Sequence, residues 1–180
     1  TRDVAVVASF AALYALLSFI PLSPIIGLPG RAITVAAVMA PLIGVILGAY
    51  MGALSALLGG SIVLWTGFLS PPSFVSGILA SFCAGLLRSR RRVVCALTYS
   101  SLLLAFSLYP AVGPVWLYPP LLWFQVAGLI LLVSPIQTAA SKRLSINPPR
   151  GVFSALLVTC LTSTLAGQIA GSLAFEAISW

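Results

Sequence analysis

Long apolar runs follow one another along the whole chain, separated by proline, glycine and short clusters of charge. They delimit seven segments: residues 4–20, 33–48, 51–67, 73–87, 93–109, 119–138 and 151–176. Runs of Leu, Ala, Val and Ile this long lack the alternation of barrel strands and favour helices. The pattern predicts an all-α integral membrane protein, a bundle of six to seven transmembrane helices forming a single polytopic domain over residues 1–180.

Several of these segments are shorter than the roughly 20 residues that a straight span requires. Either some helices are shielded by their neighbours, or the helices extend beyond the apolar segments. The joint near residue 50 has the weakest break, and a tight hairpin is expected at Gly48–Gly52. A single kinked span over 33–67 is the alternative.

Basic residues decide between these alternatives, because cytoplasmic loops of membrane proteins are enriched in Lys and Arg. Eight of the nine basic residues, all but Arg31, gather in three places along the sequence: Arg2; the run Arg88–Arg92; and Lys142, Arg143 and Arg150. Four crossings from a cytoplasmic N-terminus return the chain to the arginine run, and two more return it to the third group. The seventh crossing leaves the C-terminus outside. A multi-pass protein of the cell membrane is expected, and the hairpin preserves this parity.

Composition agrees with a membrane location. Hydrophobic residues make up 61% of the chain and charged residues 6%, against about a quarter charged in ordinary soluble domains. The net charge of +7 lies in clusters between apolar runs, so topology explains it and no nucleic-acid partner is expected. Since Thr1 is not an initiator methionine, residues can precede it. The run 4–20 lacks an Ala-x-Ala cleavage pattern and is interpreted as a retained helix.

Reactive side chains are scarce. The chain has no histidine and two acidic residues, Asp3 and Glu176, both at segment ends. Paired carboxylates, an activated nucleophile and a metal cluster are therefore unavailable, and no enzyme activity, cofactor or metal is expected. Cys83, Cys95 and Cys160 are odd in number and far apart, which argues against a disulfide framework. Because mid-segment charges are absent, uphill transport would require energy from a partner.

Small residues recur every four positions and allow close helix contact. One stripe is Ala36, Ala40, Gly44, Gly48, Gly52, Ala56 and Gly60; a second is Ser163, Gly167 and Gly171; the first segment has the pairs Ala8 and Ala12, and Ala11 and Ala15. These stripes are expected to pack inside the bundle. For the first-segment alanines, docking of another membrane protein is the alternative.

Aromatic residues favour the predicted outer end, where all four tryptophans fall: Trp65, Trp116, Trp123 and Trp180. One interpretation is an outward pocket that stacks a solute and orients it with a few polar groups. Its expected residues are Arg31, Trp65, Tyr109, Trp123, Gln125 and Glu176. The other is an ordinary interfacial belt with one snorkelling arginine. Gln137 and Gln168, inside apolar segments, are expected to hydrogen-bond across helices.

Residues 4–95 resemble an S component, the substrate-binding membrane subunit of an energy-coupling factor (ECF) transporter. The resemblance rests on four stretches: Val4–Ile20 with its Ala-x-x-x-Ala spacing, the loop Pro21–Gly30, the glycine-rich Ile43–Leu54, and Pro71–Leu87 followed by arginines. It implies uptake of a vitamin or similar micronutrient, with a transmembrane coupling subunit and two cytoplasmic ATPases as partners. It also implies that Ala8, Ala12 and Ala15 contact the coupling subunit.

Two features limit what the resemblance implies. Seven segments depart from the family's usual six, and aromatic stacking suits flavins, pyrimidines and pterins alike, so the solute is not identified. The main alternative function is a structural or accessory subunit of a larger membrane complex. A channel for neutral solutes is a third possible function.

The arginine run Arg88–Arg92 is interpreted as a topology signal that also touches anionic lipid, with contact to a cytoplasmic partner as its alternative.

Overall fold

A computed structural model describes residues 2–24, 32–108, 119–145 and 151–179. Helices account for most of these residues, so the all-α prediction is confirmed. The elements are α1 (Arg2–Ser18), β1 (Pro21–Pro24), β2 (Ala32–Thr34), α2 (Ala36–Leu47), α3 (Ala49–Trp65), α4 (Pro71–Arg88), α5 (Arg92–Leu108), α6 (Pro119–Val133), α7 (Pro135–Ser145) and α8 (Val152–Ser179).

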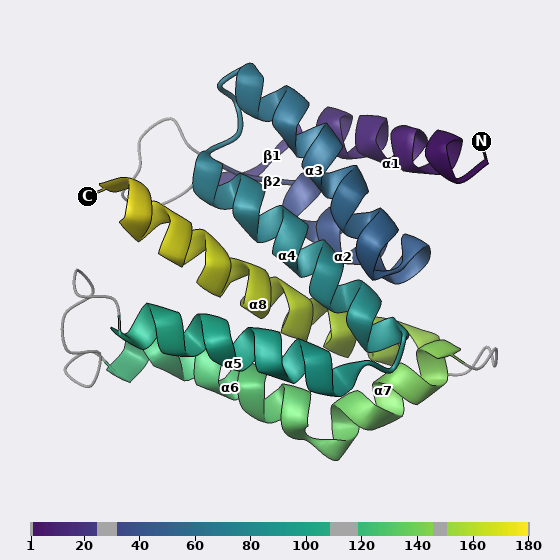
Figure 1. The fold of residues 1–180 in the computed structure, drawn as a ribbon, viewed down its shortest axis with the longest axis vertical. Coiled ribbons are helices and arrows are strands. Elements are labelled where there is room, and N and C mark those ends of the chain that lie inside the picture. The colour runs from purple at the N-terminus through teal and green to yellow at the C-terminus, as the bar shows by residue number, and fades with distance from the viewer. Residues whose placement is uncertain (1, 25–31, 109–118, 146–150, 180) are drawn as a thin grey trace.

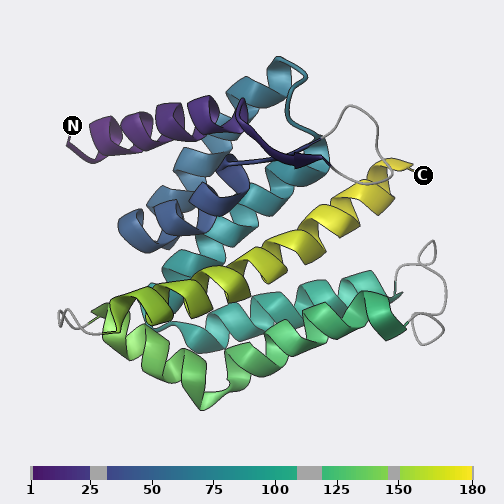
Figure 2. The same ribbon diagram turned by 180° about the vertical axis from the view of Figure 1, so that it is seen from behind.

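The helices run back and forth between two ends of a bundle, with the N-terminus at one end and the C-terminus at the other (Figure 1). α4 and α8 form the centre, with α1, α2 and α3 on one flank and α5, α6 and α7 on the other. Seen from behind, α8 crosses the middle of the bundle (Figure 2). The largest buried cluster joins α4, α5, α6 and α8, and includes Cys83, Leu87, Tyr99, Leu132 and Ile169.

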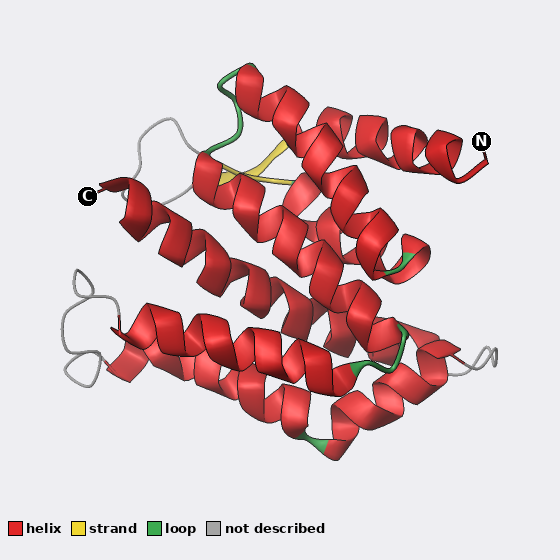
Figure 3. Ribbon diagram, viewed as in Figure 1, coloured by secondary structure: helices red, strands yellow, loops and turns green. Residues whose placement is uncertain are grey.

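The turn between α2 and α3 confirms the predicted hairpin. α2 ends at Leu47, α3 begins at Ala49, and Gly48 alone separates them with a φ of 89°. Only glycine adopts this left-handed conformation without strain. The hairpin is therefore tighter than the five residues expected, and the two helices leave it side by side (Figure 3).

The segment after α1 differs from the prediction of helices joined by loops. Pro21–Pro24 and Ala32–Thr34 form a two-stranded antiparallel ribbon, yellow in Figure 3, with Pro21 opposite Thr34 and Pro24 opposite Ala32. Proline cannot continue a helix, but it is tolerated on edge strands, because its missing N–H can face away from the partner strand. Part of the expected loop is thus ordered by pairing with the approach to α2.

The predicted segment 119–138 is two helices rather than one. α6 and α7 meet at Ser134 and are bent by 63°. Pro135 opens α7, and proline at this position removes a backbone donor from a continuous helix. α7 then continues to Ser145, so Lys142 and Arg143 belong to its last turn and not to a loop.

The small-residue stripes on α2, α3 and α8 pack inside the bundle as predicted, except for Gly48 in the turn. A Cβ on Gly44 would overlap the Ser81 carbonyl oxygen of α4, and one on Gly85 would overlap the backbone of Ala49. On α8, a Cβ on Gly171 would lie 2.9 Å from the Pro72 carbonyl oxygen. Backbones approach this closely only where side chains are missing. The stripes therefore hold α4 against α2, α3 and α8.

Helix length identifies fewer spans than the six to seven predicted. Among the described residues, α8 is the one helix long and apolar enough to cross a bilayer, with the bent pair α6 and α7 as a second if it counts as one span. α2, α3 and α5 are apolar but shorter. The length and composition of the helices therefore do not support six to seven spans.

Candidate functional site

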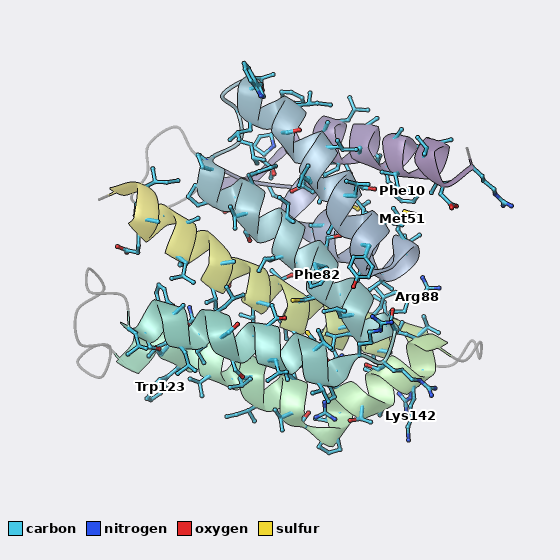
Figure 4. The ribbon with its side chains drawn as sticks, viewed as in Figure 1. Phe10, Met51, Phe82, Arg88, Trp123 and Lys142 are labelled. Atoms are coloured by element: carbon cyan, nitrogen blue, oxygen red, sulfur yellow. The ribbon has the colours of Figure 1, made fainter. Side chains whose placement is uncertain are left out.

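The described residues of the predicted aromatic pocket lie at one end of the bundle but not around one cavity. Trp65 ends α3 and is 91% exposed, and Trp123 near the start of α6 is 69% exposed. α3 and α6 lie on opposite flanks, and Figure 4 shows Trp123 at the outer edge of its flank. Arg31 and Tyr109 lie outside the described residues. The two described tryptophans thus face outward, as in an interfacial belt.

Gln125 is half-buried on α6, and its backbone is tied to α5. The Tyr99 hydroxyl donates a 2.7 Å hydrogen bond to the Gln125 carbonyl oxygen. The side-chain Oε1 of Gln125 is buried, and no described donor reaches it. Because an unpaired buried amide oxygen is costly, this atom is a natural acceptor for a bound group.

A polar ladder lies on α8, formed by Thr164, Gln168, Ser172 and Glu176. Residues four apart share one face of a helix, so these side chains form a single row. Gln168 is exposed and the other three are half-buried. We refer to this row as the α8 ladder. It occupies the C-terminal half of α8, toward the end of the bundle where the C-terminus lies (Figure 1).

Neighbouring helices bound the α8 ladder and leave Gln168 as its exposed residue. Gly167 and Gly171 meet α4, while Leu165 meets Gly128 of α6. In the N-terminal half of the helix, the corresponding face carries Leu157 and Leu161, both exposed and apolar. Polar groups therefore gather on one half of an otherwise apolar face.

The ladder corrects one sequence prediction and adds two residues. Gln168 was expected to bond across helices, yet it is exposed on the outside of α8. Thr164 and Ser172 were not predicted at all. Their spacing of four from Gln168 and Glu176 was the available signal. Gln137 behaves as predicted: it is buried, its Nε2 donates to Thr159 and its Oε1 accepts from Thr162.

The chemistry of the ladder is that of recognition. It offers two hydroxyls, an amide and a carboxylate, and Glu176 is one of the two acidic residues of the chain. Such groups donate to and accept from a polar ligand, and the carboxylate favours a donor-rich or cationic group. Among the described residues, no three His, Cys, Asp or Glu side chains gather as metal ligands, and the three cysteines are free thiols.

The first-segment alanines divide between two faces of α1. Ala8 and Ala12 are exposed, whereas Ala15 is buried with Val63 and Leu69. The predicted docking set of Ala8, Ala12 and Ala15 is therefore not one surface. Ala8 and Ala12 share an outward face, and Ala15 belongs to the packing of α1 on α3.

The residues of the arginine run differ in their contacts: Arg88 and Arg92 bond to other helices. Arg88 donates through Nη1 to the carbonyl oxygens of Val45 and, at 2.7 Å, of Ile46, which end α2. Arg92 donates to the carbonyl oxygens of Leu132 (2.7 Å) and Ser134 (3.1 Å) and to the Thr138 hydroxyl. Val45, Ile46 and Leu132 lie in the last turns of α2 and α6. Carbonyls there lack intrahelical partners, so both arginines cap helix ends. Arg90 and Arg91 are exposed.

Comparison with models of known protein families, with curated proteins and with solved structures found no match to this chain.

Proposed function

We propose that this chain is a multi-pass membrane protein that binds a small polar solute from outside and acts as an S-component-like subunit of an uptake system. The single observation that carries the binding role is the α8 ladder. Gln168 of this ladder is an exposed amide on an otherwise apolar helix face, which is costly against lipid, so a polar occupant is favoured there. Gln125, with its buried unpaired oxygen, is a further contact for the same solute.

The membrane location is supported by the distribution of side chains, which is the reverse of that in a water-soluble protein. Polar groups lie inside the bundle, including Ser55, Ser81, Gln137, Thr159 and Thr162. Large apolar side chains cover the outside of nearly every helix. Water-soluble monomers rarely expose apolar patches of such extent. Side chains placed this way suit a lipid environment, in which buried hydroxyls and amides join helices by hydrogen bonds.

The proposed orientation follows from the two ends of the bundle. Arg88 and Lys142 lie at the same end (Figure 4), where α1 begins with Arg2 (Figure 1). The positive-inside rule assigns this end to the cytoplasm. With α6 and α7 counted as one bent crossing, the chain crosses seven times. α2 has 12 residues, a length of about 18 Å. It therefore depends on α3 and α4 for shielding, and β2 extends its path.

The proposal also requires partners. No cation or acid lies in the middle of any helix, so the chain has no intramembrane group to carry a driving ion. A transmembrane coupling subunit and cytoplasmic ATPases would supply the energy. The exposed Ala8 and Ala12 on α1 offer a smooth face on which a coupling helix can pack closely.

Native mass spectrometry of the gently purified protein tests this proposal. We expect a retained small molecule and recruitment of ATPase and coupling subunits. Replacing Ser172 by Ala, or Gln168 by Ala, should each weaken binding of the retained molecule about fivefold, since one hydrogen bond contributes about 1 kcal/mol. The matched control is Ser154→Ala, an exposed serine in the other half of α8, which should bind as the wild type does.

One outcome favours the alternative function. A protein without a small molecule, held in a fixed complex with unrelated subunits, would contradict solute binding and support an accessory subunit. The α8 ladder would then be covered by a neighbouring helix, because exposed polar residues on apolar helices also join helices.

A further inference from the structure

At the cytoplasmic end of the proposed orientation, α5 and the bend between α6 and α7 meet. Arg92, the first residue of α5, bonds the carbonyls of Leu132 and Ser134 on either side of Val133, and also Thr138 on α7. These bonds fix the turn after α4 against α7. We call the surface around these bonds the bend notch.

Cations adjoin the bend notch on both of its segments. Arg90 and Arg91 precede Arg92 in the turn, and Lys142 lies one helical turn beyond Thr138, on the same side of α7. Lys142 and Arg143 are exposed, as are Arg90 and Arg91. The acidic residues of the chain are Asp3 and Glu176, and neither lies on α4, α5, α6 or α7. The four helices that form the notch therefore carry no acidic residue of their own to balance these cations.

Apolar side chains adjoin these cations. Val93 follows Arg92 and is 72% exposed, and Val133, between the two carbonyls that Arg92 bonds, is 62% exposed. Leu97 continues the exposed face of α5 one turn beyond Val93, and Ile136 does so on α7. Cations next to exposed apolar helix faces match a molecule that has an anionic head group and hydrocarbon chains.

We propose that the bend notch binds an anionic phospholipid, with the phosphate held by Arg91 and Lys142 and the acyl chains along Val93, Leu97 and Val133. The proposal rests on the membrane location given above and goes beyond solute uptake. An acidic protein would match the charges alone, but it would leave the adjoining apolar faces uncovered. The lipid would join α5 to α7 at the same place as the Arg92 bonds.

Native mass spectrometry from mixed phosphatidylglycerol and phosphatidylcholine nanodiscs tests the proposal, together with thermal unfolding in detergent after adding each lipid or inorganic phosphate. The wild type should retain phosphatidylglycerol selectively and unfold at a higher temperature with it. Arg91→Gln and Lys142→Gln should each weaken retention about fivefold, and the double variant more. Arg2→Gln removes one charge at the same end on α1, away from the notch, and is the matched control.

Equal retention of the two lipids would overturn the proposal, as would a double variant that retains phosphatidylglycerol like the wild type. Protection by inorganic phosphate equal to that by the lipid would also overturn it, because the acyl chains would then add nothing. Failure of the wild type to enter the membrane fraction would contradict the membrane location itself. Loss of solute binding with lipid selectivity intact would contradict only the solute-binding role.

Discussion

The Tyr99 hydroxyl on α5 donates a 2.7 Å hydrogen bond to the main-chain carbonyl of Gln125 on α6. The same hydroxyl lies where a Cβ on Gly128 would stand. One glycine, one turn beyond Gln125, therefore allows the tyrosine to reach the α6 backbone. The contact joins α5 to the helix that carries Gln125, a predicted solute contact.

Two substitutions test separately the Tyr99 hydrogen bond and the space beside Gly128 that the hydroxyl occupies. Tyr99→Phe removes the hydroxyl and should lower the free energy of unfolding by about 1 kcal/mol. Gly128→Ala retains the hydroxyl but leaves it no room, and should cost about 1–3 kcal/mol by overpacking. Thermal unfolding in detergent measures both. The double variant should be less destabilised than the sum of the two, and strict additivity would show that the contact is not formed.

The close approach of α2 and α4 gives a second prediction. A Cβ on Gly44 would overlap the Ser81 carbonyl oxygen, which is backbone and cannot rotate away. Gly44→Ala should therefore separate the helices and destabilise the bundle by about 1–3 kcal/mol. Val38→Ile adds one carbon at an exposed position of the same helix and should leave the unfolding temperature unchanged. A Gly44→Ala protein as stable as the wild type would refute this packing.

Helix boundaries were predictable from the sequence where one residue determines the backbone locally. Gly48 and the Ser70-Pro71-Pro72 joint are of this kind, because glycine permits a left-handed turn and proline favours the first turn of a helix. The bend at Ser134 was not predicted. Pro135 lies inside an apolar run, and nothing local distinguishes a kinked helix from two helices joined at an angle.

The site could be predicted only in part, because burial depends on tertiary neighbours. Gln137 and Gln168 look alike in sequence, yet the first is buried against Thr159 and the second is exposed on α8. The pairs Ala8–Ala12 and Ala11–Ala15 have the same spacing. Packing of α1 on α3 decides which pair is buried, and the sequence contains no local sign of that choice.

The Arg92 bonds give a third prediction, on the bend between α6 and α7. Arg92→Gln should lose much of the cap on the Leu132 and Ser134 carbonyls and lower stability by about 1–2 kcal/mol, at the low end for charged hydrogen bonds because the side chain is only half-buried. Its neighbour Arg91 is exposed, so Arg91→Gln should unfold at the wild-type temperature in lipid-free detergent. Equal effects of the two substitutions would contradict a specific role for Arg92.

The outward face of α1 gives the last prediction, which separates docking from folding. Ala12 is exposed, so Ala12→Leu should leave unfolding in detergent unchanged but abolish copurification with a coupling subunit, because the larger side chain prevents close helix approach. Ala15 is buried with Val63 and Leu69. Ala15→Leu should instead destabilise the isolated chain by about 1–3 kcal/mol. Thermal unfolding and copurification are measured on both variants. Ala12→Leu should change copurification only, whereas Ala15→Leu should lower the unfolding temperature. An intact complex with Ala12→Leu would contradict docking through this face, and would leave the exposed alanines as lipid contacts.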